Sequence, residues 1–253
     1  MNILLNGHLG KMGQELQSVA GRGDLDSKIV CKVDPGAVTD AQKGVFSSLF
    51  EIPEAKGIDA IIDFSYHGAI LPLLEYASFN SIPTLIATTG HTAEELSVIK
   101  KYSHTIPILH CANASLGMAY LKKMAELSSL FFKNAEIEII ERHDRRKADS
   151  PSGSALLLAK TMSEARPESY IRHGRCGYGA VDKNEIGIHS VRISGAVGEH
   201  EIVISTEGET VSLRHTVSDR AIFAKGALML AARLIDCAPG LYFADDFFVF
   251  GGE

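Results

Sequence analysis

Short apolar runs alternate with stretches of helical periodicity through the first 111 residues of the chain. The apolar runs cover residues 2–6, 29–33, 58–64, 83–87 and 106–111. The helical stretches between them include residues 13–20, 68–79 and 92–103. Strands that alternate with helices are typical of βαβ units and a parallel sheet. Right-handed crossovers then place helices on both faces of that sheet.

The pattern changes after residue 134. Residues 135–142 resemble a strand, 153–165 resemble a helix, and three closely spaced strand-like segments follow, at 188–194, 200–206 and 210–216. The last two alternate apolar with polar residues, which is typical of a half-exposed antiparallel sheet. The three residues Glu207-Gly208-Glu209 separate them, and we predict a hairpin loop there.

Two further segments complete the predicted organisation. Residues 166–187 are rich in Gly and Arg and weak in periodicity, so we predict a long loop there. Residues 218–236 predict a helix with an apolar face, and we expect it to return to the first domain. The predicted fold class is α/β, with a Rossmann-like parallel-sheet domain and an α+β domain whose sheet is mostly antiparallel. We place the first domain at 1–114 and 217–253 and the second at 115–216.

A glycine-rich turn joins the first predicted strand to the first helix. Gly7, Gly10 and Gly13 have G-x-x-G-x-x-G spacing, which lets a backbone approach a pyrophosphate at a helix N-terminus. The second strand then ends in Asp34, where a carboxylate can bind ribose hydroxyls. The alternative is a glycine-rich turn in some other α/β protein. A dinucleotide site is favoured because turn, strand and carboxylate occur together.

Asp34 also bears on the choice of cofactor. Its charge repels a 2′-phosphate, and Pro35 follows in place of a cation that would bind that phosphate. The sequence therefore favours NADH. Compensation by Lys11 or Lys32 leaves the use of both NADH and NADPH open.

A dense basic run lies between the predicted strand at 135–142 and the helix at 153–165. It comprises Arg142, His143, Arg145, Arg146 and Lys147, and a Ser-Pro-Ser-Gly-Ser segment follows. Such runs are usually solvated loops, and nucleic-acid binding is a second alternative. The chain is acidic overall, with a formal net charge of −6, which argues against nucleic acid. Cations beside a helix N-terminus favour a site for a small carboxylate.

Composition narrows the class of protein. The 253 residues suit one large or two small domains, and no stretch approaches the ~20 apolar residues of a membrane span. The N-terminus has no basic segment of the kind that begins a signal peptide. Four widely separated cysteines indicate free thiols in a reducing cytoplasm, and scattered histidines give no metal-ligand spacing. We therefore expect a cytoplasmic protein without a metal and with neither nucleic acid nor membrane as partner.

Several motifs together resemble the 4-hydroxy-tetrahydrodipicolinate reductase (dihydrodipicolinate reductase) family over nearly the whole chain. The family pattern E-x-H-H-x-x-K-x-D-x-P-S-G-T-A is matched by Glu141-Arg-His143-Asp144-Arg-Arg-Lys147-Ala-Asp149-Ser-Pro151-Ser152-Gly153-Ser154-Ala155. Other matching segments are Gly7 to Gly13, Ala87-Thr88-Thr89-Gly90, Cys111-Ala112-Asn113-Ala114-Ser115, Val197-Gly198-Glu199-His200 and Arg220-x-x-Phe223-Ala224-x-Gly226-Ala227.

The resemblance implies NAD(P)H-dependent reduction of a cyclic imine that carries two carboxylates, in diaminopimelate and lysine biosynthesis. It implies a homotetramer, with a dinucleotide-binding first domain and a second domain for substrate binding and oligomerisation. It makes His143 and Lys147 the acid–base pair. The residues expected at the cofactor are Gly7, His8, Leu9, Gly10, Lys11, Met12, Asp34, Ala87, Thr88, Thr89, Cys111, Ala112, Asn113 and Ala114. The residues expected at the substrate are Asp144, Ser152, Gly153, Ser154 and Arg220.

The chain departs from the family pattern at two places. Asp144 stands where the family has a second His that contacts substrate, and Arg192-Ile193-Ser194 replaces an R-x-G segment. Because an ionised Asp repels a carboxylate, we expect Asp144 to turn away and pair with Arg142, Arg145 or Arg146. Two alternative functions remain, another two-domain nicotinamide enzyme such as an aspartate dehydrogenase or a sugar oxidoreductase, and a non-catalytic NAD(H)-binding sensor.

Overall fold

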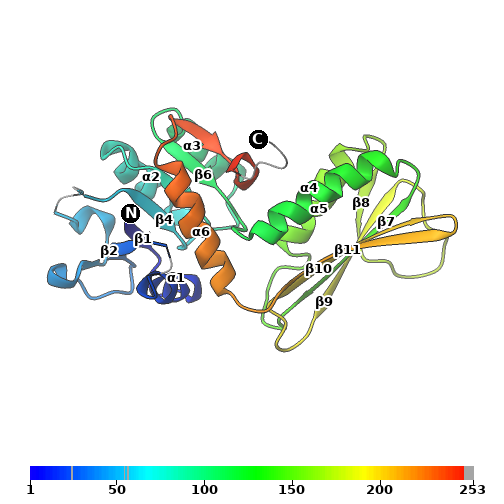
Figure 1. Ribbon diagram of the computed structural model, residues 1–253, viewed down its shortest axis with the longest axis horizontal. Helices are drawn as coiled ribbons and strands as arrows, with labels where there is room; N and C mark the ends of the chain where they lie inside the picture. The colour runs from blue at the N-terminus through cyan, green and yellow to red at the C-terminus, as the bar shows by residue number, and fades with distance from the viewer. Residues whose placement is uncertain (24, 54, 56, 248–253) are drawn as a thin grey trace. The chain divides into compact units, whose positions relative to one another are not determined.

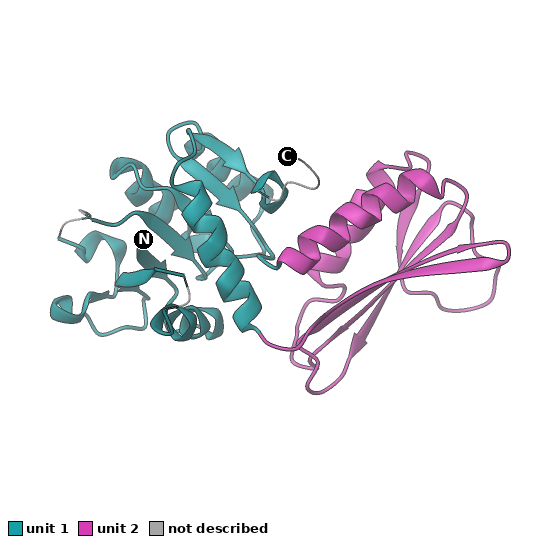
Figure 2. Ribbon diagram, in the orientation of Figure 1, with its two compact units in different colours: residues 1–115, 220–253 teal, residues 116–219 magenta. Residues whose placement is uncertain are grey.

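The computed structural model describes residues 1–23, 25–53, 55 and 57–247, and the chain divides into two compact units (Figure 2). Unit 1 comprises Met1–Ser115 and Arg220–Glu253, and unit 2 comprises Leu116–Asp219. The expected boundaries differ from these by one to three residues. Residues 248–253 of the expected first domain lie outside the described residues.

Unit 1 is built on a seven-stranded sheet of order β12-β6-β5-β4-β1-β2-β3, in which every neighbouring pair is parallel. The five predicted strands are present, namely β1 (Asn2–Asn6), β2 (Lys28–Val33), β4 (Ala60–Asp63), β5 (Thr84–Ile86) and β6 (Pro107–His110). Two short edge strands were not predicted, β3 (Val45–Phe46) and β12 (Gly240–Tyr242). The two residues of β3 are too few to show a period.

Helices cover both faces of this sheet because its strands are apolar on both sides. Ile3 and Leu5 face a core completed by α1 (Lys11–Gly21) and α6 (Ala221–Leu234). Leu4 faces the opposite core, completed by α2 (Ile70–Phe79) and α3 (Ala93–Tyr102). In Figure 1 the C-terminal helix α6 crosses the sheet of unit 1, where it contacts β4, β5 and β6. Its predicted return to the first domain is therefore confirmed.

Within its described residues, unit 1 also contains four short 3-10 helices. They are η1 (Ala41–Lys43), η2 (Leu49–Glu51), η3 (His67–Ala69) and η4 (Ala244–Phe247). The helix α3 begins with a reciprocal cap, in which the Thr92 hydroxyl accepts from Glu95 N–H and the Glu95 carboxylate accepts from Thr92 N–H.

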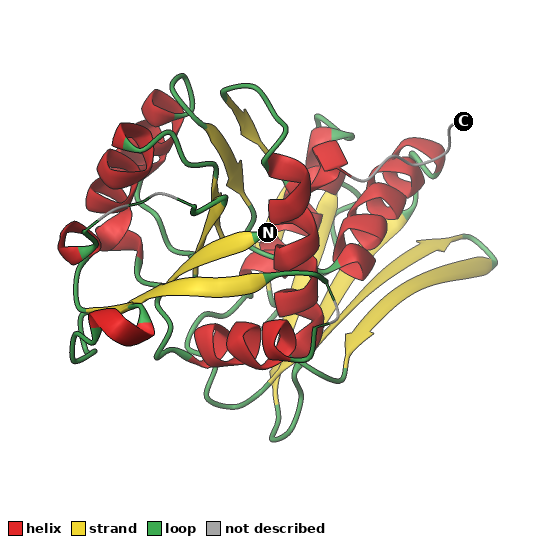
Figure 3. Ribbon diagram, turned by 60° about the vertical axis from the view of Figure 1, so that its left-hand side comes forward, coloured by secondary structure: helices red, strands yellow, loops and turns green. Residues whose placement is uncertain are grey.

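Unit 2 is a five-stranded sheet of order β11-β10-β7-β9-β8, with α4 (Leu116–Phe131) and α5 (Gly153–Glu164) packed on one face (Figure 3). The strand β10 (Gly198–Thr206) pairs antiparallel with β7 (Glu136–His143) and β11 (Glu209–Val217). The strand β9 (Glu185–Arg192) pairs parallel with β7 and with β8 (Tyr170–His173). The antiparallel β10–β11 ladder is the longest of the four.

The predicted loop at 166–187 is wrong in part, because it contains β8 and the first residues of β9. The reason is that β8 is an exposed edge strand with one apolar aliphatic residue, Ile171, and so has no apolar alternation. The first residue of β9, Glu185, is a buried acid rather than an apolar residue. Its carboxylate forms ion pairs with Arg172 and Arg175.

The predicted hairpin is present, but its loop is one residue shorter than expected. Thr206 pairs with Glu209, which leaves Glu207 and Gly208 as the loop. Gly208 has φ +94°, a left-handed conformation that favours glycine. Among the described residues, no helix combines the length and apolar character needed to cross a membrane.

Candidate active site

The predicted cofactor residues gather at one edge of the unit 1 sheet. Gly7–Met12 follow β1, Asp34 follows β2, Ala87–Thr89 follow β5 and Cys111–Ala114 follow β6. Since all these strands are parallel, their carboxyl ends meet at the same edge, where ligands bind in open α/β sheets.

The glycine-rich turn has space for backbone only. Gly7 has φ +84°, and a Cβ there would lie 2.5 Å from the Phe64 carbonyl oxygen. A Cβ on Gly13 would lie 2.2 Å from the Gly7 carbonyl oxygen. The first intrahelical bond runs from Gln14 N–H to Gly10 O, so the N–H groups of the preceding turn lie at the helix N-terminus. The first turn of α1 carries no acidic residue, and Gly10 offers no side-chain cap. The N-terminus of α1 is therefore electropositive and can bind an anion.

Asp34 holds this turn in place and lines a cavity beside it. Its Oδ2 accepts from Leu9 N–H at 3.3 Å, and its Oδ1 accepts from Gly36 N–H at 2.9 Å. The cavity has a volume of about 390 Å³, and its lining includes Gly7, Gly10, Asp34, Pro35, Ser47, Ser48, Phe50 and Tyr66. Lys32 lines a different hollow, with Gln17 and Lys28. Lys32 is therefore not among the residues that line the Asp34 cavity.

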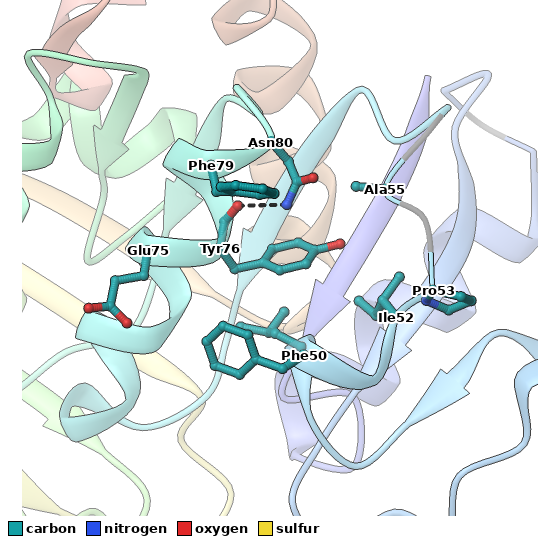
Figure 4. A pocket seen from close by; sticks show the side chains of 9 residues that line it. Phe50, Ile52, Pro53, Ala55, Glu75, Tyr76, Phe79 and Asn80 are labelled. Atoms are coloured by element: carbon teal, nitrogen blue, oxygen red, sulfur yellow. Dashed lines mark hydrogen bonds between the residues drawn. The ribbon is translucent and has the colours of Figure 1, made fainter.

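A second cavity of about 530 Å³ adjoins the first, since both are lined by Leu49 and Phe50 (Figure 4). Tyr76 and Phe79 of α2 line its other side, with Asn80 donating to the Tyr76 carbonyl at 2.9 Å. Burial raises the pKa of the Tyr76 hydroxyl to about 12. None of the predicted site residues lines this cavity.

Asp63, at the end of β4, ties three strand ends together. Its Oδ1 accepts from Asn6 Nδ2 at 2.8 Å and from the Ser65 hydroxyl at 2.6 Å, and its Oδ2 accepts from the Thr88 hydroxyl at 2.6 Å. Burial raises the pKa of Asp63, and these hydrogen bonds oppose the rise. The bond to Thr88 fixes the segment after β5 that the sequence assigned to the cofactor.

The helix α6 supports the segment after β6 through a close backbone approach. A Cβ on Gly226 would lie 1.8 Å from the Ala114 carbonyl oxygen, so only glycine lets α6 lie against Cys111–Ala114. Cys111 N–H also donates to the Ile86 carbonyl at 2.9 Å. Burial raises the pKa of the Cys111 thiol to about 11, which keeps it un-ionised at neutral pH.

The other predicted cluster lies in unit 2, where β7 ends. His143 is the last residue of β7, and its Nδ1 lies 2.5 Å from Oε2 of the fully buried Glu141. Arg192 of β9 donates to both oxygens of Glu141, at 2.7 and 2.8 Å. The Ser152 N–H donates to Glu141 Oε1 at 3.2 Å. Burial alone would raise the pKa of Glu141, but hydrogen bonds from His143, Arg192 and Ser190 hold it well below its usual range.

Ser152 caps the helix α5 and meets a second histidine. Its hydroxyl accepts from Ala155 N–H at 3.2 Å, which makes Ser152 the N-cap of the helix. The same hydroxyl lies 3.2 Å from His200 Nε2. Burial and the neighbouring His143 lower the pKa of His200 to about 3, so its ring is neutral at physiological pH. Gly153 and Ser154 form the first turn of α5, where the helix N–H groups begin.

The loop between β7 and α5 contains two further predicted residues, Lys147 and Asp144. Lys147 pairs with Asp149, Nζ to Oδ1 2.8 Å, rather than with His143. Asp144 accepts from Arg146 Nε at 2.7 Å and from the Gly195 N–H at 3.3 Å. The pairing of Asp144 with a neighbouring arginine is thus confirmed, and it holds the pKa of that carboxyl well below its usual range.

The predicted residue Arg220 is placed in unit 1, directly before α6, with an exposed side chain. Within the described residues, no group of three His, Cys, Asp or Glu side chains has an arrangement that could hold a metal ion.

The sequence motifs assigned no role to Glu141, Arg192 or His200, although all three lie in quoted motifs. Their roles follow from contacts between residues far apart in the chain, such as Arg192 with Glu141. The signal available for Glu141 in the sequence was an acidic residue near the end of a strand-like segment, directly before a run of cationic residues.

Comparison with known proteins places the whole chain in one family. Residues 1–114 match the family model "Dihydrodipicolinate reductase, N-terminus", and residues 117–248 match "Dihydrodipicolinate reductase, C-terminus". A 4-hydroxy-tetrahydrodipicolinate reductase of Clostridium novyi is 36% identical over 247 residues, which is 96% of each chain. One from Campylobacter concisus is 40% identical over 205 residues, 79% of this chain and 78% of its own.

A solved structure confirms the fold class. The dipicolinate-bound dihydrodipicolinate reductase of Paenisporosarcina sp. TG-14 superposes with a TM-score of 0.77 at 24% identity, covering 96% of this chain and 97% of its own. A myo-inositol dehydrogenase of Corynebacterium glutamicum shares the fold at a TM-score of 0.62 and 14% identity, covering 95% of this chain and 90% of its own.

Proposed function

Since the chain belongs to the dihydrodipicolinate reductase family, we propose that it reduces 4-hydroxy-tetrahydrodipicolinate to tetrahydrodipicolinate with NAD(P)H, in diaminopimelate and lysine biosynthesis. The observation that carries the proposal is the end of β7, where His143, Lys147 and the Ser152-capped start of α5 come within one short loop. A proton donor beside cations and a helix N-terminus suits a substrate with two carboxylates.

Unit 1 fits a dinucleotide cofactor. The glycine turn leaves the room that a pyrophosphate needs, and Gly7 and Gly10 line the same cavity as Asp34. Asp34 already accepts two backbone N–H groups, and its remaining lone pairs can accept ribose hydroxyls. We propose NADH as the favoured cofactor, because the Asp34 carboxylate opposes a 2′-phosphate and Lys32 faces a separate hollow.

When bound, the dihydronicotinamide supplies the hydride, and the residues of unit 2 manage charge and protons. His143 gives a proton to the reduced, electron-rich product. Lys147 exchanges its Asp149 partner for a substrate carboxylate and balances the ring nitrogen. Ser152, Gly153 and Ser154 hold the carboxylate at the N-terminus of α5, and Arg220 supplies a further cation. Asp144 is kept from repelling the substrate by Arg146.

The resemblance further implies a homotetramer, with unit 2 as the oligomerisation unit. We also propose a cytoplasmic location, where the four free cysteines would remain reduced.

A coupled assay tests the function and the cofactor preference together. Dihydrodipicolinate synthase generates the substrate in place, and oxidation of NADH and NADPH is followed at 340 nm. We expect kcat/KM to be equal or higher with NADH, and Asp34→Ala to shift the ratio toward NADPH. A preference for NADPH beyond tenfold would contradict the role given to Asp34. No oxidation of either cofactor would favour a different dehydrogenase or a non-catalytic NAD(H) sensor.

A further inference from the structure

We propose that Glu141, clamped by Arg192, is the positioning residue that sets the tautomer and orientation of His143. The inference deepens the proposed function, on which it rests for the reaction that His143 serves. It is carried by the hydrogen bonds of a carboxylate that has no solvent-exposed surface.

The donors around Glu141 determine where the hydrogen of His143 lies. Arg192 donates two N–H groups, one to each oxygen of Glu141, in the bidentate geometry of an ionised pair. The Ser152 N–H adds a third donor. An ionised carboxylate can only accept hydrogen bonds. The 2.5 Å contact with Glu141 Oε2 therefore requires that Nδ1 of His143 carries a hydrogen.

This assignment leaves Nε2 as the atom of His143 that takes up and releases a proton. Nε2 lies over Gly198 of β10, where a Cβ would come within 3.3 Å of it. Glycine at that position leaves Nε2 without a covering side chain. The His143 side chain is 12% exposed, so a small ligand can contact part of the ring. Glu141 thus holds the ring from behind and presents Nε2.

The other charged and titratable groups around His143 do not compete for this role. Lys147 and Arg192 are cations and accept no hydrogen bond, whereas the Glu141 carboxylate lies at hydrogen-bond distance from Nδ1 of His143. The His200 ring lies 5.1 Å from that of His143, centroid to centroid, and is kept neutral by burial. His143 is therefore the member of this histidine pair that can carry the proton.

The same strand carries a matched control. Glu138 of β7 also contacts a histidine and an arginine, His189 at 2.7 Å and Arg175. That group lies beside the start of β9, away from the Ser152 cap, and the Glu138 side chain is 26% exposed. It also binds its histidine through Nε2 and not through Nδ1. Glu138→Gln therefore breaks a similar charge cluster without altering His143.

The kinetic test compares Glu141→Gln with Glu138→Gln in the full-length enzyme. We expect Glu141→Gln to lower kcat by about 10- to 1000-fold with KM for NADH unchanged, because losing the positioning of a general acid should cost no more than the ~10²–10⁴-fold that the acid itself contributes. Without the carboxylate, the protonated ring is less stable, so the fall in kcat/KM at high pH should begin at lower pH. Glu138→Gln should stay within about twofold of wild type. Equal losses in both variants, or an unmoved pH profile, would overturn the proposal.

A spectroscopic test needs no turnover and reads the tautomer in the wild-type protein. The wild-type protein is labelled with 15N-histidine, and His143 is assigned by its loss in His143→Gln. At a pH where the ring is neutral, we expect its Nδ1 to carry the hydrogen and its Nε2 to be bare. The opposite tautomer would overturn the proposal even if the reductase assay succeeds. The expected tautomer with a failed assay would leave the positioning intact and reject the proposed substrate.

Discussion

Each unit of the molecule buries a carboxylate near the carboxyl end of a strand, and these two carboxylates, Asp63 and Glu141, are satisfied in opposite ways. Asp63 of unit 1 accepts from an amide and two hydroxyls, all of them neutral. Glu141 of unit 2 accepts from Arg192 and from His143. Burial alone raises the pKa of both, but only Glu141 has a cationic partner, and only its pKa ends below the usual range.

The difference shows what each buried charge does. Neutral donors around Asp63 join β1, β4 and β5 without creating a site that exchanges protons. Around Glu141 the donors include a histidine whose charge state can change, so the same kind of burial couples structure to proton transfer. Asp63 therefore stabilises the edge of the sheet proposed to bind the cofactor, and Glu141 supports the proposed proton transfer.

Removing the proton-handling side chains should give the largest effect and the sharpest contrast between the two regions. We expect His143→Ala and Lys147→Ala each to lower kcat by ~10²–10⁴-fold with the NADH dissociation constant almost unchanged. Thr88→Val, which removes a donor to Asp63, should instead raise KM for NADH. Steady-state kinetics and fluorescence titration with NADH measure both. Near wild-type turnover in either alanine variant would remove that residue from the chemistry.

The two carboxylates should also give stability effects of opposite sign with pH. The pKa of Glu141 is lowered by folding, so its stabilising contribution is present above its unfolded pKa of ~4.3 and is lost as pH falls through the folded value. The pKa of Asp63 is raised, so its contribution is largest below its unfolded pKa of ~3.9 and declines as pH rises through the folded value.

Urea unfolding of wild type, Glu141→Gln and Asp63→Asn between pH 3.5 and pH 8 measures these contributions. The free energy of unfolding of wild type relative to Glu141→Gln should grow with pH. Relative to Asp63→Asn it should shrink. Slopes of the same sign would mean that the neutral and cationic surroundings do not distinguish the two carboxylates.

Asp144 gives the smallest expected effect, because Arg146 already neutralises it. A histidine there can donate to a substrate carboxylate, whereas an ionised Asp cannot. We expect Asp144→His to leave the KM for the dihydrodipicolinate substrate equal or lower by a few fold, and the same reductase assay measures it. A large rise in KM with intact folding would show that Asp144 itself supports the site, and its assignment from the family pattern would then be abandoned.

Local pattern predicted those elements whose cause is local. The glycine turn, the five apolar strands of unit 1 and the helix that begins at Gly153 follow from neighbours in the sequence. Helix α4 was not predicted, since Leu116, Tyr120, Leu127 and Leu130 are exposed and blur its apolar stripe. Strand β8 was missed because it is an exposed edge strand without apolar alternation.

The residues of the candidate site can be divided in the same way, into those identified from a local run and those that depend on distant contacts. His143 and Lys147 could be named because they belong to one short run of residues. The contact of Glu141 with Arg192 spans 51 residues, and that of Asp63 with Thr88 spans 25. Such pairs depend on strand order, which a single sequence does not contain. Only the structure shows that Lys32 and Asp34 line two different cavities.

The division of unit 1 into two chain segments constrains how the protein is made. On the ribosome, residues 1–115 emerge first, and all of unit 2 must be translated before α6 appears. Until then Ile3, Leu5 and Ile62 lack the apolar residues of α6 that cover them, such as Leu228 and Leu230. Unit 2 is contiguous and contains its own core, so it can be completed earlier. One apolar face of the unit 1 sheet therefore stays uncovered while more than a hundred codons are translated. During that interval, we expect the exposed face to be a binding site for a chaperone.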